Sequence, residues 1–152
     1  MPSQPKRNFP SLVAGALLAL AVGIVSGCGS SGPKTIPVSG KVTYKNKPVT
    51  IGRVVFQPVE IAKGLPERPA MGEFQDDGSY RLSSFTQNDG PVPGKYCVVI
   101  HAMISGPTPE NPTAPTVWAV PQRYTSTQTT PLKAQIPSDA SGALEFNFEL
   151  TD

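Results

Sequence analysis

Two residues of this chain have the side chains of a nucleophile and a general base, Cys97 and His101. A cysteine paired with an imidazole is a common arrangement for covalent catalysis. Both residues fall in the segment YCVVIHA, whose alternation predicts a strand. Four residues of extended chain span about 13 Å, at roughly 3.3 Å per residue, so the two side chains share a face but do not touch. The spacing therefore predicts a small half-buried cysteine, a surface histidine and no catalytic residue.

His101 is the only histidine in the chain, which excludes sites built from several histidines. Asp76 and Asp77 stand beside Gly78, and their carboxylates could supply oxygens to a calcium ion. Calcium takes roughly six to eight oxygen ligands, and no spaced series of Asp or Asn surrounds this pair. Asp-Gly between alternating segments is also a strong hairpin signal. We therefore expect a turn here, and we predict no metal and no cofactor.

An aromatic pair in the Pro-rich segment 103–124 is the candidate for ligand binding. Trp118 is the only tryptophan, and Tyr124 follows it closely in the same segment. If exposed, the two rings could stack on a sugar or a peptide. Alternatively, Trp118 could cap one end of the hydrophobic core. The sequence leaves both interpretations open.

The N-terminal residues have the organisation of an export signal. Lys6 and Arg7 form a short positive segment, and residues 12–25 (LVAGALLALAVGIV) form an uncharged apolar run. A membrane-spanning helix needs roughly 20 apolar residues. This run is shorter, and its length is typical of a signal peptide.

Small residues and a cysteine follow the apolar run directly. The sequence VSGC, which ends at Cys28, resembles a bacterial lipobox, the motif whose cysteine receives a lipid. An ordinary secretory signal with an incidental cysteine is the alternative. We predict a lipoprotein signal peptide at 1–27 and lipidation at Cys28. A flexible tether rich in Gly, Ser and Pro is predicted at 28–37, before a domain at 38–152.

Removal of the signal changes the charge balance of the chain. Thirteen Lys and Arg face 11 Asp and Glu, and Lys6 and Arg7 leave with the signal, so the formal charge falls from +2 to zero. No basic surface is then left for nucleic acid. The expected partners are a membrane, through the lipid on Cys28, and an envelope protein or polysaccharide. Cys97 could be free, oxidised or paired between chains.

The segment after the tether alternates with period two, which is typical of half-buried strands. Alternating apolar positions occur in about seven short segments, at VSGKVTY, GRVVFQP, the two sides of the Asp-Gly turn, YCVVIHA, LKAQI and ALEFNFEL. Pro58 is expected to end the second of these strands. The pattern predicts an all-β fold, an antiparallel β-sandwich, with the Pro-rich connections 58–70 and 103–121 at its ends.

Several of these segments resemble a known family. VSGKVTYKNKPV, GRVVFQP, DDGSYRL and PVPGKYCVVI are similar to the carboxypeptidase regulatory-like domain, a transthyretin-like sandwich. VPQRYTSTQTTPLKAQI and FNFEL resemble small planctomycete lipoproteins of this kind. The resemblance covers about 38–150 and implies an accessory module without an active site. The transthyretin-like hydrolases have several histidines and a different C-terminal sequence, so the resemblance does not extend to them.

These observations predict an exported protein, lipid-anchored on the periplasmic or cell-surface side of an envelope membrane. We expect its sandwich to be non-enzymatic, with a structural or binding role. The alternative is a carbohydrate- or peptide-binding module that uses the Pro-rich 103–124 loop.

Overall fold

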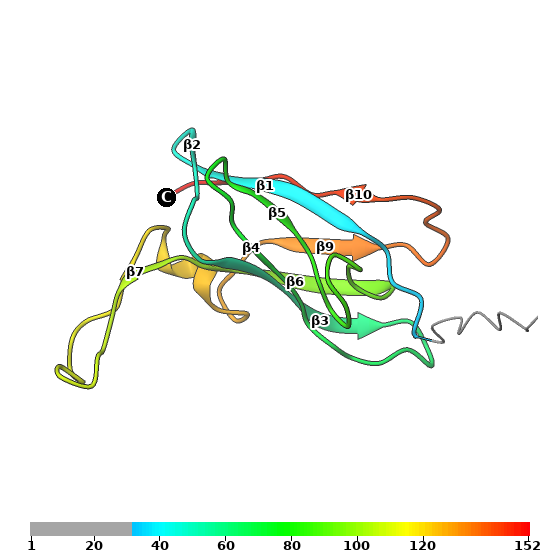
Figure 1. Ribbon diagram of the computed structural model, residues 1–152, viewed down its shortest axis with the longest axis horizontal. Helices are drawn as coiled ribbons and strands as arrows, with labels where there is room; N and C mark the ends of the chain where they lie inside the picture. Colours follow the sequence, from blue (N-terminus) through cyan, green and yellow to red (C-terminus); the bar gives the residue numbers. More distant parts are fainter. Residues whose placement is uncertain (1–31) are drawn as a thin grey trace, which may run out of the picture. The chain divides into compact units, whose positions relative to one another are not determined.

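The computed structural model describes residues 32–152, so the predicted signal peptide and Cys28 lie outside the described residues. The described part is all-β, as predicted, with eleven strands and one short 3-10 helix (Figure 1). In chain order these are β1 (Val38–Tyr44), β2 (Lys47–Pro48), β3 (Arg53–Ile61), β4 (Ala70–Glu73), β5 (Ser79–Arg81), β6 (Gly94–His101), β7 (Met103–Ser105), β8 (Val117–Trp118), η1 (Gln122–Thr125), β9 (Lys133–Ile136), β10 (Leu144–Glu145) and β11 (Phe148–Leu150).

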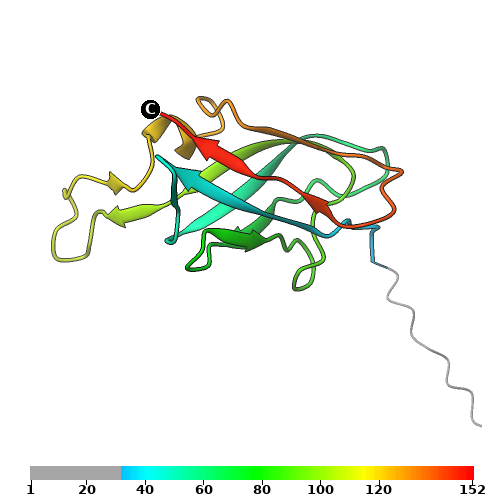
Figure 2. The same cartoon turned by 90° about the horizontal axis from the view of Figure 1, so that it is seen from above.

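Two sheets form the body of the domain. A five-stranded sheet is built around β1, which pairs with β2 and β5 on one side and with β10 and β11 on the other. A four-stranded sheet has the order β4-β3-β6-β9. Figure 2 shows β1 and the red C-terminal strands lying over the strands of the second sheet. The prediction of a sandwich-like fold is confirmed, and the strands are more numerous than the seven expected.

Not every strand pair is antiparallel, because β10 and β11 both run parallel to β1. The chain enters β10 from the connection after β9, at the end of the domain where β1 begins. There the Leu144 N–H donates to the carbonyl of Pro37, at 2.9 Å. Since the last segment starts beside the start of β1, it runs in the same direction. Sequence alternation cannot reveal this direction.

The core lies between the inner faces of the two sheets and is centred on Phe56, which is 0% exposed. Its ring lies 5.9–6.5 Å, between centroids, from those of Tyr80, Tyr96, Phe146 and Phe148. All four rings are tilted or edge-on to that of Phe56, and aromatic pairs favour such arrangements over a face-to-face sandwich. Burial without a charged neighbour raises the pKa of Tyr96 to about 12.

The prediction that this strand ends at Pro58 is wrong, because β3 continues to Ile61. Its pairing with β6 shifts between Pro58 and Glu60, which marks a bulge. β4 pairs only with residues 53–56, so beyond them one edge of β3 is open. Proline is tolerated at such open edges and bulges because it lacks an N–H to donate.

The predicted Asp-Gly hairpin is present as β4, a turn and β5. Gly78 has a φ of 75°, a conformation that glycine adopts without strain. Asp77 accepts the Ser79 N–H (3.0 Å) and pairs with Lys41 Nζ (2.7 Å), and these two contacts lower its pKa well below its usual range. Both contacts hold the Asp77 side chain within the turn and against β1.

The β4–β5 hairpin also connects the two sheets. Met71 in β4 exchanges two backbone hydrogen bonds with Ser83, and the Gln75 N–H donates to the carbonyl of Ser79. β5 in turn pairs with β1, whereas β4 pairs with β3. The outer surface is therefore continuous from one sheet to the other along this side.

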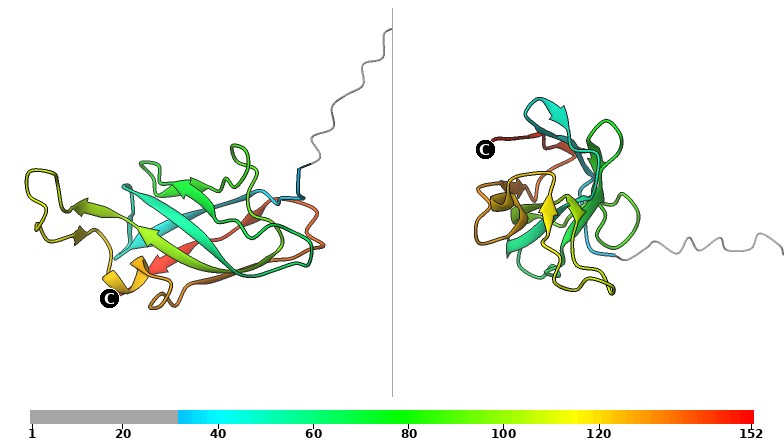
Figure 3. Two further views of the ribbon diagram at one scale, coloured as in Figure 1. Left: turned by 90° about the horizontal axis from the view of Figure 1, so that it is seen from below. Right: turned by 90° about the vertical axis from the view of Figure 1, so that its left-hand side faces the viewer.

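The predicted connection 103–121 contains a small two-stranded sheet, β7–β8, which projects from one end of the body (Figure 3). Met103 lies opposite Trp118 in this hairpin. Met103, Ile104 and Val117 are exposed. The hairpin follows the end of β6 and forms a sheet of its own.

The predicted tether, 28–37, is in part a piece of the domain. Ile36 is 2% exposed, and its N–H donates to the carbonyl of Pro91 (2.9 Å). Lys34 Nζ donates to the carbonyl of Ser138 (2.9 Å). A lone aliphatic residue among Gly, Ser and Pro gives no periodic signal, so the sequence placed the boundary too late.

Candidate ligand-binding site

The two predicted aromatic residues do not form a shared platform. Tyr124, in η1, is 3% exposed and lies with the core, so it does not meet the condition of exposure on which stacking depends. Trp118 is half-buried, and its ring centroid lies 6.4 Å from that of His101. Of these two aromatic residues, only Trp118 is left as a candidate for contact with a ligand.

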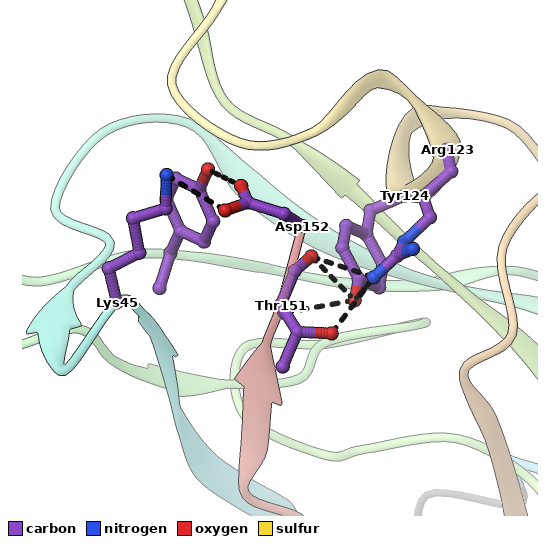
Figure 4. Close-up of polar contacts among 6 residues, drawn as sticks. Lys45, Arg123, Tyr124, Thr151 and Asp152 are labelled. Carbon is purple, nitrogen blue, oxygen red and sulfur yellow. Dashed lines mark hydrogen bonds and ion pairs between the residues drawn. The ribbon is translucent and has the colours of Figure 1, made fainter.

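Tyr124 instead fixes the C-terminal end of the chain (Figure 4). Its hydroxyl accepts the Thr151 N–H (3.1 Å) and an N–H from Arg123 Nη2 (2.9 Å), and it donates to the Thr151 carbonyl (3.2 Å). Arg123 Nη2 also donates to the Thr151 carbonyl (2.7 Å). Burial alone would raise the pKa of Tyr124, but the bonds from Thr151 and Arg123 outweigh it, so the pKa is lowered.

A second pair of contacts holds the last residue. Tyr44 donates its hydroxyl hydrogen to Asp152 Oδ1, and Lys45 Nζ lies 3.0 Å from Asp152 Oδ2. The bond from Tyr44 and the ammonium of Lys45 lower the pKa of Asp152. Together with the Tyr124 contacts, these bonds hold Thr151 and Asp152, the two residues after β11, against η1 and the end of β1 (Figure 4).

Trp118 borders a depression of about 500 Å³ on the outer face of the four-stranded sheet. We call it the Trp118 depression. Its lining residues lie in, or directly beside, β3, β4, β6 and the β7–β8 hairpin: Gly52, Arg53, Glu73, Phe74, His101, Met103 and Trp118.

Strand register brings the polar residues of this depression together. Arg53 lies directly opposite Glu73 on one neighbouring strand and opposite His101 on the other. Residues directly opposite one another project from the same face of a sheet. The next residues along, Val54 and its partners, face the core instead. An acid, a guanidinium and an imidazole therefore stand in one line beside the indole of Trp118.

The charges of this line are available to a ligand. Within residues 32–152 there are three ion pairs, and none involves Arg53 or Glu73. Arginine offers up to five N–H donors, and a carboxylate offers two acceptor oxygens. The depression thus combines an aromatic face with donors and acceptors, a combination suited to holding a polar ligand.

Cys97 and His101 have separate surroundings. Cys97 is 3% exposed, so it is buried and not half-buried as predicted. Its thiol lies 3.3 Å from Lys133 Nζ and 3.5 Å from the Thr127 carbonyl, because Lys133 and the segment after η1 cover this face of β6. His101 borders the Trp118 depression, and Cys97 does not.

Metal-ligating residues are dispersed over the part of the chain from Gly32 onward, where no three of them form a group that could hold an ion. In the same part of the chain, no helix is long and apolar enough to cross a membrane.

Comparisons with known proteins do not assign the chain to a family. No family model matches it, and no curated protein matches it. Among solved structures it is similar to a 9R-lipoxygenase from Cyanothece PCC8801, with 12% identity and a TM-score of 0.38. The similarity covers 78% of this chain and 16% of the lipoxygenase chain. The class that the fold itself defines is an all-β, sandwich-like domain, and it has a depression beside Trp118.

Proposed function

We propose that the protein is an exported, lipid-anchored protein of the cell envelope whose sandwich binds a ligand and has no catalytic role. The N-terminal sequence supports export and lipid anchoring, since a positive segment, an apolar run and VSGC at Cys28 occur in the order of a lipoprotein signal. Residues 38–150 resemble carboxypeptidase regulatory-like domains and small planctomycete lipoproteins that contain such a domain. This resemblance supports a role as an accessory module without an active site.

The position of the Trp118 depression carries the binding part of the proposal. The chain enters the domain at Lys34 and Ile36, whose partners Ser138 and Pro91 lie beside the start of β6. His101 is the last residue of β6 and the Trp118 ring lies beside it, so both residues lie at the other end of this strand. Strand β6 can be followed in Figure 1. The two ends of β6, Gly94 and His101, are seven residue steps apart, which is about 23 Å of strand. A domain held by its N-terminus therefore presents the Trp118 depression at the end away from the attachment.

Electrostatic attraction does not contribute to attachment, because the chain from Cys28 onward has a formal charge of zero. A single acyl chain gives only marginal membrane binding, whereas two or more suffice for stable anchoring. A diacylglyceryl group on Cys28 supplies two chains. The lipid is thus the proposed source of membrane affinity.

Labelling with a radioactive fatty acid, followed by detergent phase partitioning, tests the anchor. The wild-type chain should incorporate label and enter the detergent phase. Cys28→Ser should abolish the label, and Cys97→Ser is the matched control that should retain it. An unlabelled wild-type protein, or loss of label in Cys97→Ser, would contradict the proposal.

A further inference from the structure

The line of polar residues beside Trp118 is part of a longer row that crosses six strands. Ser39 lies opposite both Glu145 in β10 and Arg81 in β5. The register of the β4–β5 hairpin, set by the Met71–Ser83 bridge, places Arg81 opposite Glu73. Arg53 and His101 continue the line across β3 and β6. We call this set the transverse row: Glu145, Ser39, Arg81, Glu73, Arg53 and His101.

The surface along the transverse row is hollowed. A second depression, of about 780 Å³, lies over β1, β5 and β4 and is bordered by Ser39, Arg81 and Glu145. Glu73 lines both this depression and the Trp118 depression. The two hollows therefore adjoin at Glu73. Five inter-strand spacings of roughly 4.8 Å give the row a length of about 24 Å.

We propose that the transverse row binds an extended, uncharged polysaccharide chain, with Trp118 stacking on the sugar at one end. This proposal rests on the proposed function and names the class of ligand. A length of about 24 Å at that strand spacing exceeds what a single sugar ring can occupy. Side chains with several donors or acceptors recur along it, which suits a polymer with repeated hydroxyl groups.

The charges of the row select against charged polymers. Two arginines, Arg53 and Arg81, alternate with two carboxylates, Glu73 and Glu145, so the four formal charges sum to zero. An acidic chain would meet the carboxylates and a basic chain the guanidinium groups. Like charges placed side by side penalise the wrong partner.

The direction of the row selects against an extended peptide. Peptides commonly bind sheets by adding a strand to an open edge, where free backbone groups supply hydrogen bonds. The transverse row instead runs across strands whose backbone groups are already paired within the ladders. A peptide lying along the row would leave its own amides without those partners.

Isothermal titration of the full chain, produced with its own signal peptide and purified in detergent, tests this proposal. The probes are the hexasaccharides and disaccharides of cellulose, xylan, mannan and amylose, with polygalacturonate and polylysine as charged comparisons. The variants are Trp118→Ala, Arg53→Gln and Arg81→Gln. Arg68→Gln, an exposed arginine outside the row, is the matched control.

At least one neutral hexasaccharide should bind, and Trp118→Ala and Arg53→Gln should each weaken its binding about tenfold, because a few contacts, often of Trp and Arg, carry most of the binding energy of an interface. Arg81→Gln should weaken the hexasaccharide but leave the disaccharide within about twofold, because the short ligand does not reach Arg81. Arg68→Gln should match the wild type.

Binding to none of the neutral hexasaccharides, tighter binding of polygalacturonate or polylysine, or an Arg81→Gln variant that binds the hexasaccharide as the wild type does would each overturn the proposal. The lipid on Cys28 is measured on the same preparation. An unlipidated chain with the expected sugar binding would contradict the proposed anchor and leave this inference standing.

Discussion

Replacing Tyr124 with Phe should lower the free energy of unfolding and leave sugar binding unchanged. The ring is 3% exposed and keeps its packing in the variant, so the change removes only the hydroxyl. Three hydrogen bonds disappear, two with Thr151 and one with Arg123. Arg123 keeps its own bonds to the Thr151 carbonyl and hydroxyl (2.7 and 2.9 Å).

The expected loss is about 1–2 kcal/mol. A buried group left without its partner costs about 1–3 kcal/mol, and the upper part of that range does not apply because Thr151 is exposed and water can reach it. Urea unfolding, followed by the fluorescence of Trp118, measures this loss. With a slope of about 2 kcal/mol per M, the midpoint should fall by about 0.5–1 M.

Tyr44→Phe makes the same chemical change at the same terminus and serves as the control. Its hydroxyl bonds to the exposed Asp152, so we expect a change below about 0.5 kcal/mol. If Tyr124→Phe keeps the wild-type midpoint but loses hexasaccharide binding, Tyr124 is a ligand contact and its structural role is refuted.

Three further predictions concern the core, the thiol and the response to acid. Phe56→Ala should lower the free energy of unfolding by about 3–5 kcal/mol, and Val59→Ala, at an exposed position of the same strand, by less than about 0.5 kcal/mol in urea titrations. Cys97 should resist a thiol reagent in the native protein, and one thiol per chain should react after unfolding if Cys28 is lipidated. The bond to Lys41 lowers the pKa of Asp77 in the folded state. The ionised Asp77 therefore contributes to the stability of the fold above the unfolded-state pKa of about 3.9, and this contribution is lost as the pH falls below that value. The stability difference between wild type and Asp77→Asn should therefore shrink below about pH 4, and a difference that grows would contradict this assignment.

Local patterns predicted the elements whose signals lie within a few residues. Alternation identified the buried face of β1, and Asp-Gly identified the β4–β5 hairpin. Alternation identified only one of the two buried faces of β6, because Cys97 and Val99 are buried as well. The extension of β3 past Pro58 was missed because it depends on which edge is open. The parallel direction of β11 was missed because its partner, β1, is distant in sequence.

The candidate site was predictable only in part. Trp118 stood out because it is the only tryptophan, but a sequence cannot show that Tyr124 turns toward Thr151. Glu73 and Arg53 meet only through the register of β3 with β4. In the sequence, Arg53 and Glu73 each occupy an outward-facing position of a strand. That pattern could have indicated them only if the pairing of β3 with β4 had been known.

Mass spectrometry of the mature N-terminus tests the central claim most directly. The account predicts an N-terminal peptide that begins at Cys28 and carries a diacylglyceryl group, with or without a further acyl chain on its amine. A chain that begins at another residue, or an unmodified Cys28, would contradict it.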